Sequence, residues 1–318
     1  MRRTDHLDPD DVRDVLALAG AAGDADGAYP LAEHVVLHLR HGGDAPAVHL
    51  LARETDGELV GYAHLDTTDL IDGPSAELVV HPMHRRCGLG RALVDGAVLA
   101  AAQADPAGRL RLWAHGDHPS ANALALRLGF DRSRVLWQMR RSLYAPVPPP
   151  ELPTGVTIRA FRPGADDEAW VAINNRAFAD HPDQGRWTLH DLRVRMAEPW
   201  FDPDGFLLAF GRTDALLGFH WTKVHGEVHT HPLPSGRQPH HHEPIGEVYV
   251  VGVDPAAAGL GLGSALTVAG LRYLRGRGLD QAMLYVDESN TRAAKLYTRL
   301  GFARWSTDVC FRRWEVSG

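Results

Sequence analysis

The sequence has little cysteine and little lysine. Cys87 and Cys310 are its only cysteines, too few for a disulfide framework or a cysteine-rich zinc site. Lys223 and Lys295 are its only lysines, so arginine supplies nearly all of the positive charge. The formal net charge is −7 at pH 7, which argues against nucleic acid as the main partner.

Long apolar runs are also missing. No stretch of 18 apolar residues occurs, so the sequence predicts no membrane-spanning helix. Residues 1–6 turn acidic at once and lack the apolar core of a signal peptide, so we expect a cytoplasmic protein with reduced cysteines. The 318 residues, 44% hydrophobic and 23% charged, are typical of a globular protein with room for two domains.

Proline is concentrated in one segment. Five of the nine residues from 145 to 153 are proline, and this composition is typical of a semi-rigid, extended linker. A long surface loop within one domain is the alternative interpretation. We expect an N-terminal domain at 1–144, a linker at 145–155 and a C-terminal domain at 156–318.

The two halves repeat one order of elements. The first half predicts strands at 59–63 and 77–81, a glycine-rich loop at 85–90, a helix at 91–102, a strand at 110–113 and a helix at 123–128. The second half predicts strands at 216–220 and 247–253, a loop at 258–263, a helix at 264–275, a strand at 282–286 and a helix at 293–300. So many matched elements indicate a duplication.

Each loop lies between a strand and a helix. Unpaired N–H groups and the dipole at a helix start attract phosphate, and glycine lets the phosphate approach closely. The loops are not P-loops, because no Gly-Lys-Ser/Thr follows, and they lack the full Gly-x-Gly-x-x-Gly spacing of a dinucleotide site. A tight turn without a ligand is the alternative interpretation.

The end of each half strengthens the phosphate interpretation. A Leu-Gly-Phe sequence, 128–130 in the first half and 300–302 in the second, follows a helix, where glycine suits the helix end. Loop, helix, strand and ending together resemble the GCN5-related N-acetyltransferase superfamily. The resemblance implies an α/β (α+β) fold of two tandem domains, each a mixed central sheet flanked by helices. It also implies that acetyl-coenzyme A places its pyrophosphate on the loop and its pantetheine arm along the preceding strand.

The two halves differ at the position of the superfamily's general acid. Acyl transfer to an amine needs a proton acceptor for the amine, donors for the oxyanion and a proton for the leaving thiolate. Tyr297, four residues before Gly301, matches the usual acid, whereas Ala125 stands at the equivalent place of the first half. An aromatic anchor between helix and sheet is the alternative role for Tyr297. We therefore expect catalysis in the second half only.

Glu247 is the candidate base. Side chains alternate along a strand, so Glu247, Tyr249 and Val251 share one face if no bulge intervenes. Glu77 lies five residues before its proline and Glu247 eight before its own, an odd difference that predicts opposite faces. An exposed charge near a strand start is the alternative for Glu247. The superfamily resemblance places the oxyanion donor at a backbone N–H near Val251 or Gly252.

A closer resemblance, to the mycothiol synthase family, covers nearly the whole chain. The segments that carry it include AHG at 114–116, QMRR at 138–141, NNRAF at 174–178, HPDQG at 181–185, WFDPDG at 200–205, GFHWTKVH at 218–225, GEVYVVGVDP at 246–255 and LYV at 284–286. That family acetylates the cysteinyl amine of cysteinyl-glucosaminyl-inositol, the last step of mycothiol biosynthesis. The resemblance implies a small thiol-sugar substrate, and we expect a monomer.

The resemblance also implies specific contacts. The substrate contacts would be Glu33, Asp183, Lys223, Glu247 and Tyr285, although plain surface charges are the alternative for Glu33, Asp183 and Lys223. The coenzyme contacts of the second half would be Val251, Gly252, Val253, Ala258, Gly259, Leu260, Gly261, Leu262, Gly263, Ser264, Asn290, Thr291, Arg292, Ala293, Ala294 and Lys295. Those of the first half, where a second coenzyme molecule could bind, would be Leu78, Val79, Val80, Arg86, Cys87, Gly88, Leu89, Gly90 and Arg91.

Three features depart from the pattern or stand outside it. Ala258 occupies a position where the family has Gln or Arg, while the first half keeps Arg85 there, so the first loop could hold coenzyme at least as well. The insertion at 225–242 is rich in histidine and is either a solvated loop, a lid or a metal-binding tract. Cys87 has no obvious His/Asp partners, and we predict neither a nucleophile nor a metal centre.

Three functions remain open from sequence. They are mycothiol synthase, a tandem acetyltransferase for another amine such as an aminoglycoside or a protein N-terminus, and a non-enzymatic coenzyme A sensor. Tyr297 with Glu247 disfavours the sensor. The match over the whole length favours the first function over the second.

Overall fold

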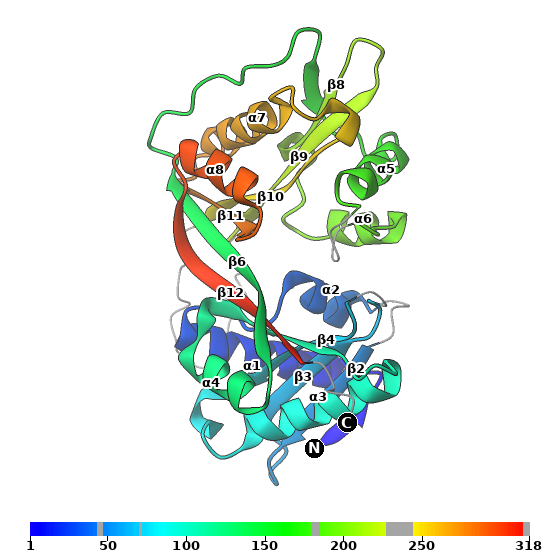
Figure 1. The fold of residues 1–318 in the computed structure, drawn as a ribbon, viewed down its shortest axis with the longest axis vertical. Helices are drawn as coiled ribbons and strands as arrows, with labels where there is room; N and C mark the ends of the chain where they lie inside the picture. The colour runs from blue at the N-terminus through cyan, green and yellow to red at the C-terminus, as the bar shows by residue number, and fades with distance from the viewer. Residues whose placement is uncertain (43–46, 70–71, 180–184, 227–243, 314–318) are drawn as a thin grey trace. The chain divides into compact units, whose positions relative to one another are not determined.

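The computed structural model describes residues 1–318 except 43–46, 70–71, 180–184, 227–243 and 314–318 (Figure 1). It divides into two compact units. The first comprises Met1–Trp137 with Ser306–Gly318, and the second comprises Gln138–Trp305. Among the described residues, no helix is both long and apolar enough to cross a membrane.

The first unit is a mixed sheet with two pairs of helices. Its elements are β1 (Arg2–Thr4), α1 (Pro9–Asp26), α2 (Glu33–His41), β2 (Ala47–Arg53), β3 (Leu59–Asp66), β4 (Ser75–Val80), a 3-10 turn (Pro82–His84), α3 (Leu89–Ala104), β5 (Leu110–Ala114), a second 3-10 turn (His115–Asp117), α4 (Pro119–Arg127) and parts of β6 (Asp131–Ser142) and β12 (Ala303–Arg313). The strands from β1 to β5 lie in chain order, with β4 and β5 parallel and the other pairs antiparallel.

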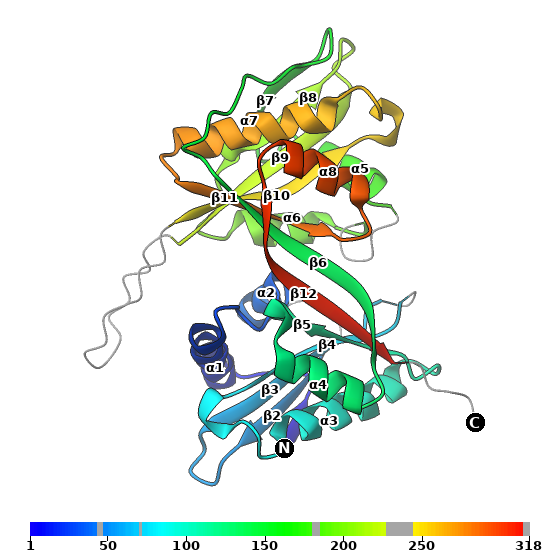
Figure 2. The same cartoon turned by 60° about the vertical axis from the view of Figure 1, so that its left-hand side comes forward.

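Helices cover both faces of this sheet, as Figure 2 shows. On one face α1 and α2 pack against the sheet through a cluster that includes Val15, Leu18, Ala22, Val35, Leu39, Tyr62 and Val79. On the other face α3 and α4 pack through a cluster that includes Leu93, Ala97, Ala101, Leu112, Ala125 and Phe130. The two apolar clusters explain why β3 between them is buried from Leu59 to Leu65.

The second unit repeats the plan. Its elements are the end of β6, β7 (Thr157–Ala160), α5 (Asp167–Ala177), α6 (Leu189–Met196), a 3-10 turn (Pro203–Gly205), β8 (Phe206–Phe210), β9 (Leu216–His225), β10 (Ile245–Val253), a 3-10 turn (Pro255–Ala257), α7 (Leu262–Gly276), β11 (Gln281–Asp287), α8 (Thr291–Arg299) and the start of β12. The strand order is β7-β8-β9-β10-β11, and only β10 and β11 among these pair in parallel.

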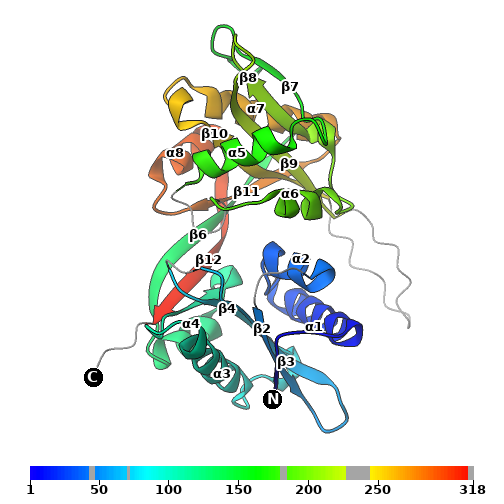
Figure 3. The same ribbon diagram turned by 90° about the vertical axis from the view of Figure 1, so that its right-hand side faces the viewer.

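In Figure 3, α5 and α6 lie on the near side of the sheet of the second unit. The core is aromatic on this α5 and α6 face and aliphatic on the α7 face. Trp170 and Trp221 are fully buried with ring centroids 5.4 Å apart, and Phe206 stacks on Trp221 at 4.3 Å. On the α7 face, Leu262 and Leu266 pack with other apolar side chains of that face. Large buried rings of this kind contribute much of the stability of a core.

The helix boundaries follow from side-chain caps. Asp8 is the N-cap of α1 and accepts a hydrogen bond from the N–H of Asp11 at 2.8 Å, and Pro9 is the first residue of the helix. Thr188 and Asp191 form a reciprocal capping box at the start of α6. Asn290 caps α8 by accepting from the N–H of Ala293 at 3.1 Å.

The observed units differ from the domain ranges expected at 1–144 and 156–318. The end of β12, Val309 to Arg313, pairs antiparallel with β5, so the last described strand belongs to the first unit. The proline-rich segment at 145–155 lies within the second unit instead of between the two. Val147 there is buried, and its carbonyl accepts a hydrogen bond from Arg272 at 3.0 Å.

A buried ion cluster fixes β12 in the first unit. Asp308 on β12 accepts hydrogen bonds from the backbone N–H of Gly116 and from Nδ1 of His115, each at 2.9 Å. The other ring nitrogen of His115 lies 3.6 Å from the Glu77 carboxylate, which also accepts the N–H of Ala32 at 2.5 Å. Burial alone would lower the pKa of His115, but the carboxylates of Asp308 and Glu77 raise it to about 10.

We predict that this cluster stabilises the first unit below neutral pH and loses its effect in alkali. The pKa of His115 is raised above the value of about 6.5 for an unfolded histidine, so its contribution is fully present below that pH and disappears toward pH 10. The difference in unfolding free energy between wild type and His115→Gln should therefore shrink from pH 6 to pH 10. Urea titrations across this range measure it, and a constant or growing difference would contradict the prediction.

Candidate active site

The glycine-rich loop of the second unit forms the start of α7. Gly259 and Gly261 have positive φ angles of 85° and 78°, a conformation that glycine adopts without strain. Gly261 is the N-cap residue and provides no side-chain cap, so no side chain occupies the first N–H groups of α7. A helix start of this kind suits a phosphate group.

A cavity of about 460 Å³ opens beside this loop. Arg292 and Arg299 of α8 line it together with Tyr297. The remaining lining residues are Ala177, Val251, Val253, Ala257, Ala258, Gly259, Gly261, Leu262, Gly263, Ser264, Thr267, Asn290, Ala293 and Leu296. The two arginines supply positive charge that Ala258 does not, so the cavity suits a phosphate ester despite the missing basic residue of the loop.

Most of the expected coenzyme residues of the second half line this cavity, but five do not. Gly252, Leu260, Thr291, Ala294 and Lys295 are absent from its lining. Leu260 is exposed and Ala294 is buried in the unit. A Cβ at Gly252 would come within 2.5 Å of the Phe219 ring, which explains why glycine is needed there.

Strands β10 and β11 part next to the cavity. They pair only at Gly246 and Glu247, although β10 continues to Val253 and β11 to Asp287. Beyond Glu247, the edge of β10 toward β11 therefore has no strand partner among the described residues. An extended ligand can pair with such a free edge.

A β-bulge in β10 changes which residues share a face. The register with β9 shifts between Val248 and Val250. Tyr249 packs with the aromatic cluster beneath α5 and α6, whereas Val251 packs with Leu262 on the α7 face. Glu247, Tyr249 and Val251 were expected to share one face only in a strand without a bulge. The bulge inverts the alternation beyond it, so Val251 lies on the opposite face.

The same bulge corrects the comparison of Glu247 with Glu77. Glu77 pairs with His64 and lies on the α1 and α2 face, as Val79 does, in a strand pair without a register shift. Glu247 pairs with Lys223 and lies on the equivalent face of the second unit. The expected opposite faces are wrong, and Glu77 corresponds instead to Val250.

Tyr297 projects from α8 into the cavity. Its ring meets Phe302 edge to face at a centroid distance of 5.9 Å, which holds its orientation. Burial raises the pKa of its hydroxyl to about 12. The hydroxyl therefore keeps its proton at neutral pH and can donate it.

Three of the five expected substrate residues lie on one face of the second unit. These are Lys223, Glu247 and Tyr285. Lys223 on β9 pairs with Glu247 on β10, which pairs with Met283 on β11. Tyr285 follows Met283 by two residues and so lies on the same face. Its hydroxyl accepts a hydrogen bond from Gln138 at 2.8 Å, which fixes its position.

Aromatic rings surround the ammonium group of Lys223. Its Nζ lies 4.6 Å from the centre of the Trp200 ring and 5.3 Å from that of Tyr249. Arg195 donates a hydrogen bond to the hydroxyl of Tyr249 at 2.9 Å and stacks on Trp187. These cation–π contacts hold a buried positive charge opposite Glu247.

His225 contacts the candidate base, and the sequence did not lead us to expect this contact. It lies two residues after Lys223 on β9, and its Nε2 is 2.6 Å from Oε2 of Glu247. Strand alternation places it on the face of Lys223, and this spacing was the signal that could have found it. The sequence reasoning had grouped it with the histidine-rich insertion.

The other two expected substrate residues are Asp183 and Glu33. Asp183 lies outside the described residues, as does most of the insertion at 225–242. Glu33 is the first residue of α2 in the first unit.

The loop of the first unit is built differently. Arg86 stands where the second unit has Gly259 and keeps a positive φ of 67°. Arg85 donates two hydrogen bonds to the Asp26 carboxylate, at 2.7 and 2.8 Å, and this ion pair neutralises its charge. A Cβ at Gly90 would lie 3.3 Å from Leu124, which packs against the apolar cluster under α4.

The other expected coenzyme residues of the first half are divided between core and surface. Val79 is buried beneath α1, while Leu78 and Val80 pack on the opposite cluster. Exposed Cys87 donates its thiol to the carbonyl of His84. Gly88 caps α3, which begins at Leu89, and exposed Arg91 lies 3.6 Å from Asp95.

The first unit also lacks counterparts of the second unit's polar residues. Ala125, at the position of Tyr297, is buried in the apolar core. Aligning Gly61 with Gly218 through the strand registers places Asp66 and Ser75 where the second unit has Lys223 and Glu247.

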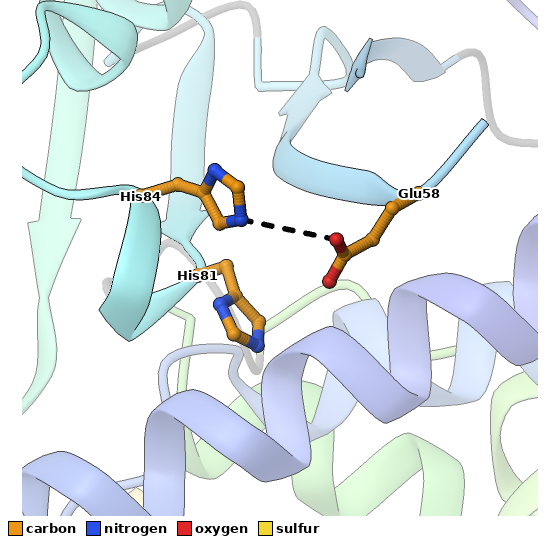
Figure 4. Close-up of side chains that lie close together, drawn as sticks. All are labelled: Glu58, His81 and His84. Atoms are coloured by element: carbon orange, nitrogen blue, oxygen red, sulfur yellow. Dashed lines mark ion pairs between the residues drawn. The ribbon is translucent and has the colours of Figure 1, made fainter. Parts of the chain in front are cut away.

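Glu58, His81 and His84 form a small cluster in the first unit, and their ligand-type atoms lie within 4.8 Å of one another (Figure 4). His84 is 3.8 Å from Glu58, and Nδ1 of His81 accepts the N–H of Met83 at 3.3 Å. A neutral His81 ring therefore carries its proton on the other nitrogen and has no free lone pair for a metal. We interpret the cluster as surface ion pairs.

Comparisons with known proteins agree with this geometry. The chain matches the acetyltransferase (GNAT) family over residues 20–130 and 168–302. It is 61% identical to the mycothiol acetyltransferase of Salinispora arenicola, over 98% of this chain and 96% of that protein. It is 60% identical to the mycothiol acetyltransferase of Acidothermus cellulolyticus, over 94% of this chain and 90% of that protein.

Two solved structures are similar over nearly the whole chain. A GCN5-related N-acetyltransferase from Sphaerobacter thermophilus has a TM-score of 0.67 and 28% identity, over 98% of this chain and 95% of that one. A tandem GNAT protein from the clavulanic acid biosynthesis pathway has a TM-score of 0.70 over 96% and 95%, and its 21% identity supports the fold alone.

The predicted superfamily, the tandem fold and the enzyme class are thus confirmed, with acetyl-coenzyme A as the cosubstrate. The chain belongs to the acetyltransferase (GNAT) family and, within it, to the mycothiol acetyltransferases.

Proposed function

We propose that this chain transfers an acetyl group from acetyl-coenzyme A to the cysteinyl amine of cysteinyl-glucosaminyl-inositol, which completes mycothiol. Its relatives named mycothiol acetyltransferase support the substrate. The observation that carries the proposal is the Lys223–Glu247 pair at the point where β10 and β11 part, in the unit that also has Tyr297 in its cavity. We place the reaction in the cytoplasm and expect a monomer.

The cavity of the second unit binds the coenzyme in this proposal. The N–H groups at the start of α7 and the side chains of Arg292 and Arg299 hold the phosphates. The free edge of β10 pairs with the extended pantetheine arm and directs the acetyl group toward Glu247. Backbone N–H groups near Val251 and Gly252 stabilise the negative charge that develops on the acetyl oxygen.

The amine of the substrate is held beside Glu247. An α-amine has an ordinary pKa of about 7.7–8.0, so modest assistance from a base suffices at neutral pH. Glu247 holds the ammonium form beside it and assists the loss of its proton as a general base. Acetyl-coenzyme A supplies the activated acetyl group, and Tyr297 donates the proton that the departing thiolate takes up.

The hydroxyl-rich part of the substrate needs further hydrogen bonds. Lys223 donates to hydroxyl oxygens, whereas the carboxylates of Glu33 and Asp183 accept from hydroxyl groups. Tyr285 can do both, and its hydroxyl is already positioned by Gln138. We assign these four residues to the sugar and inositol rings.

The first unit has a structural or regulatory role in this proposal. Ala125 cannot donate a proton, and Asp66 with Ser75 does not reproduce the pair of Lys223 with Glu247. Its loop can still hold a second coenzyme molecule through the N–H groups at the start of α3.

Mass spectrometry tests the substrate directly. Purified protein is incubated with acetyl-coenzyme A and a panel of amines that includes cysteinyl-glucosaminyl-inositol, an aminoglycoside and a peptide with a free N-terminus. We expect N-acetylation of the cysteinyl compound by far the fastest. Preferred acetylation of another amine would overturn the assigned substrate.

The two loops give a matched pair of variants. Gly88 and Gly261 both cap a helix with positive φ, and no atom lies within 4 Å of a Cβ at either position. Aspartate tolerates this conformation better than most residues, but its charge repels a phosphate at a cost of several kcal/mol, or about 10²-fold or more in binding. We predict that Gly261→Asp abolishes turnover at ordinary coenzyme concentrations and that Gly88→Asp does not. If a folded Gly88→Asp variant lost turnover, the assignment of catalysis to the second unit would be wrong.

Tyr297→Phe removes one hydroxyl and keeps the ring against Phe302. General acid assistance is worth about 10² to 10⁴ in rate, so we predict a loss of that order in kcat with little change in KM. Tyr144→Phe is the matched control, because Tyr144 is 74% exposed in the same unit. The measurement is kcat against pH with both substrates saturating. Near-wild-type kcat for Tyr297→Phe would remove this residue from the mechanism.

A further inference from the structure

The carboxylate of Glu247 is poorly accessible and already engaged. Its side chain is 8% exposed, while the imidazole of His225, which contacts it at 2.6 Å, is 35% exposed. An amine that arrives from solvent therefore reaches the imidazole more easily than the carboxylate. In the part of the chain that the structure describes, Nδ1 of His225 has no hydrogen-bond partner.

The contact determines how the two groups share protons. A carboxylate oxygen only accepts, so a neutral imidazole at 2.6 Å carries its proton on Nε2 and donates it to Glu247. The lone pair of the ring then lies on Nδ1. A buried carboxylate that orients an imidazole in this way also stabilises the imidazolium that forms when the ring takes up a proton.

We propose that His225 and Glu247 act together as the base, with Nδ1 of His225 as the proton acceptor. This inference rests on the proposed acetyl transfer and deepens it. The N–H bond of the substrate ammonium breaks, and its proton forms the Nδ1–H bond of the imidazolium, directly or through one water molecule. The amine nitrogen keeps the electron pair that attacks the acetyl carbon. As the C–S bond then breaks, the nitrogen loses a second proton to solvent, and the thiolate takes the proton of Tyr297, which solvent replaces. The imidazolium later returns the proton to solvent.

The groups around the pair fit this role. Lys223 on β9 faces Glu247, Tyr249 on β10 lies beside them with its hydroxyl bound to Arg195 of α6, and β11 contributes Met283 and Tyr285. Lys223 and Arg195 are the cations of this set, and both lie against aromatic rings. The Glu247 carboxylate offsets this positive charge, which would otherwise disfavour the imidazolium.

The chemistry of the two groups gives a measurable difference. An imidazole ordinarily has a pKa of about 6.5 and a carboxyl group one of about 4.3. An acceptor with a pKa nearer the operating pH is the better base. As the pH falls, protonation therefore inactivates a base that includes the imidazole at a higher pH than it inactivates a carboxylate alone. At neutral pH, the reaction is faster with the imidazole than with the carboxylate alone.

The test is the pH dependence of kcat for His225→Gln, with acetyl-coenzyme A and the acceptor amine saturating. Glutamine can still donate a hydrogen bond to Glu247 but takes up no proton. We expect kcat at pH 7 to fall about tenfold and the acid limb to move downward by about one to two pH units, because glutamine removes the imidazole as proton acceptor. His190→Gln, the same change at an exposed position of α6, should leave the profile unaltered.

A second variant separates the chemical role from a structural one. In His225→Ala, added imidazole should restore part of the lost rate, because it can occupy the vacated space beside Glu247. The inference is overturned if the acid limb of His225→Gln stays in place, or if its rate is lower by one factor at every pH, or if imidazole has no effect. The proposed function is judged separately by the product that wild type makes. If wild type acetylates another amine, the same profiles are measured with that amine.

Discussion

The second unit depends on one irregularity, the bulge in β10 where that strand separates from β11. A regular strand would turn Glu247 away from the aromatic face or leave β11 paired along its whole length. With the bulge, β10 contributes residues to both faces of the sheet. Glu247 lies beside Lys223 and His225 on one face, while Val251 lines the cavity on the other. The separated strands then leave backbone groups free for a ligand.

The two units of the duplication share the loop that starts a helix and differ in their polar residues. Both units retain a capped turn, a glycine N-cap and a helix, so the anion-binding geometry survives in each. In the first unit, Ala125 of the apolar core stands at the position of Tyr297, and Asp66 and Ser75 stand at those of Lys223 and Glu247, while Glu77 joins a structural ion cluster at the position of Val250. Burial alone would raise the pKa of Glu77, but His115 and the backbone N–H of Ala32 lower it, so this carboxylate is a poor proton acceptor.

The sequence predicted most of the fold, because its signals are local. The helix expected at 264–275 is observed at Leu262–Gly276, and the strand expected at 282–286 at Gln281–Asp287. The bulge could not be predicted from the sequence, because the alternation of residues along a strand does not reveal where one extra residue is inserted. The pairing of β12 with β5 depends on a partner far away in sequence, and proline content alone does not tell a linker from a segment packed on one unit.

The candidate site was predictable to the same degree. Tyr297 and Glu247 follow from motif spacing, and the structure places the first in the cavity and the second opposite Lys223. His225 was missed because the neighbouring histidine-rich stretch masked its position on β9. Its relation to Glu247 runs diagonally across two strands, and such a contact needs the register, which only the structure supplies.

The position of β12 has a consequence for how the chain is made. The first unit needs the last described strand to complete its sheet and to bring Asp308 to His115. At 5–20 residues per second, a ribosome needs roughly ten to thirty-five seconds to reach that strand after finishing β6 of the first unit. During this time, β5 has an unpaired edge, and a buried histidine lacks one of its two carboxylates. The N-terminal half is therefore translated first, but its sheet is completed only when the last described strand has been made.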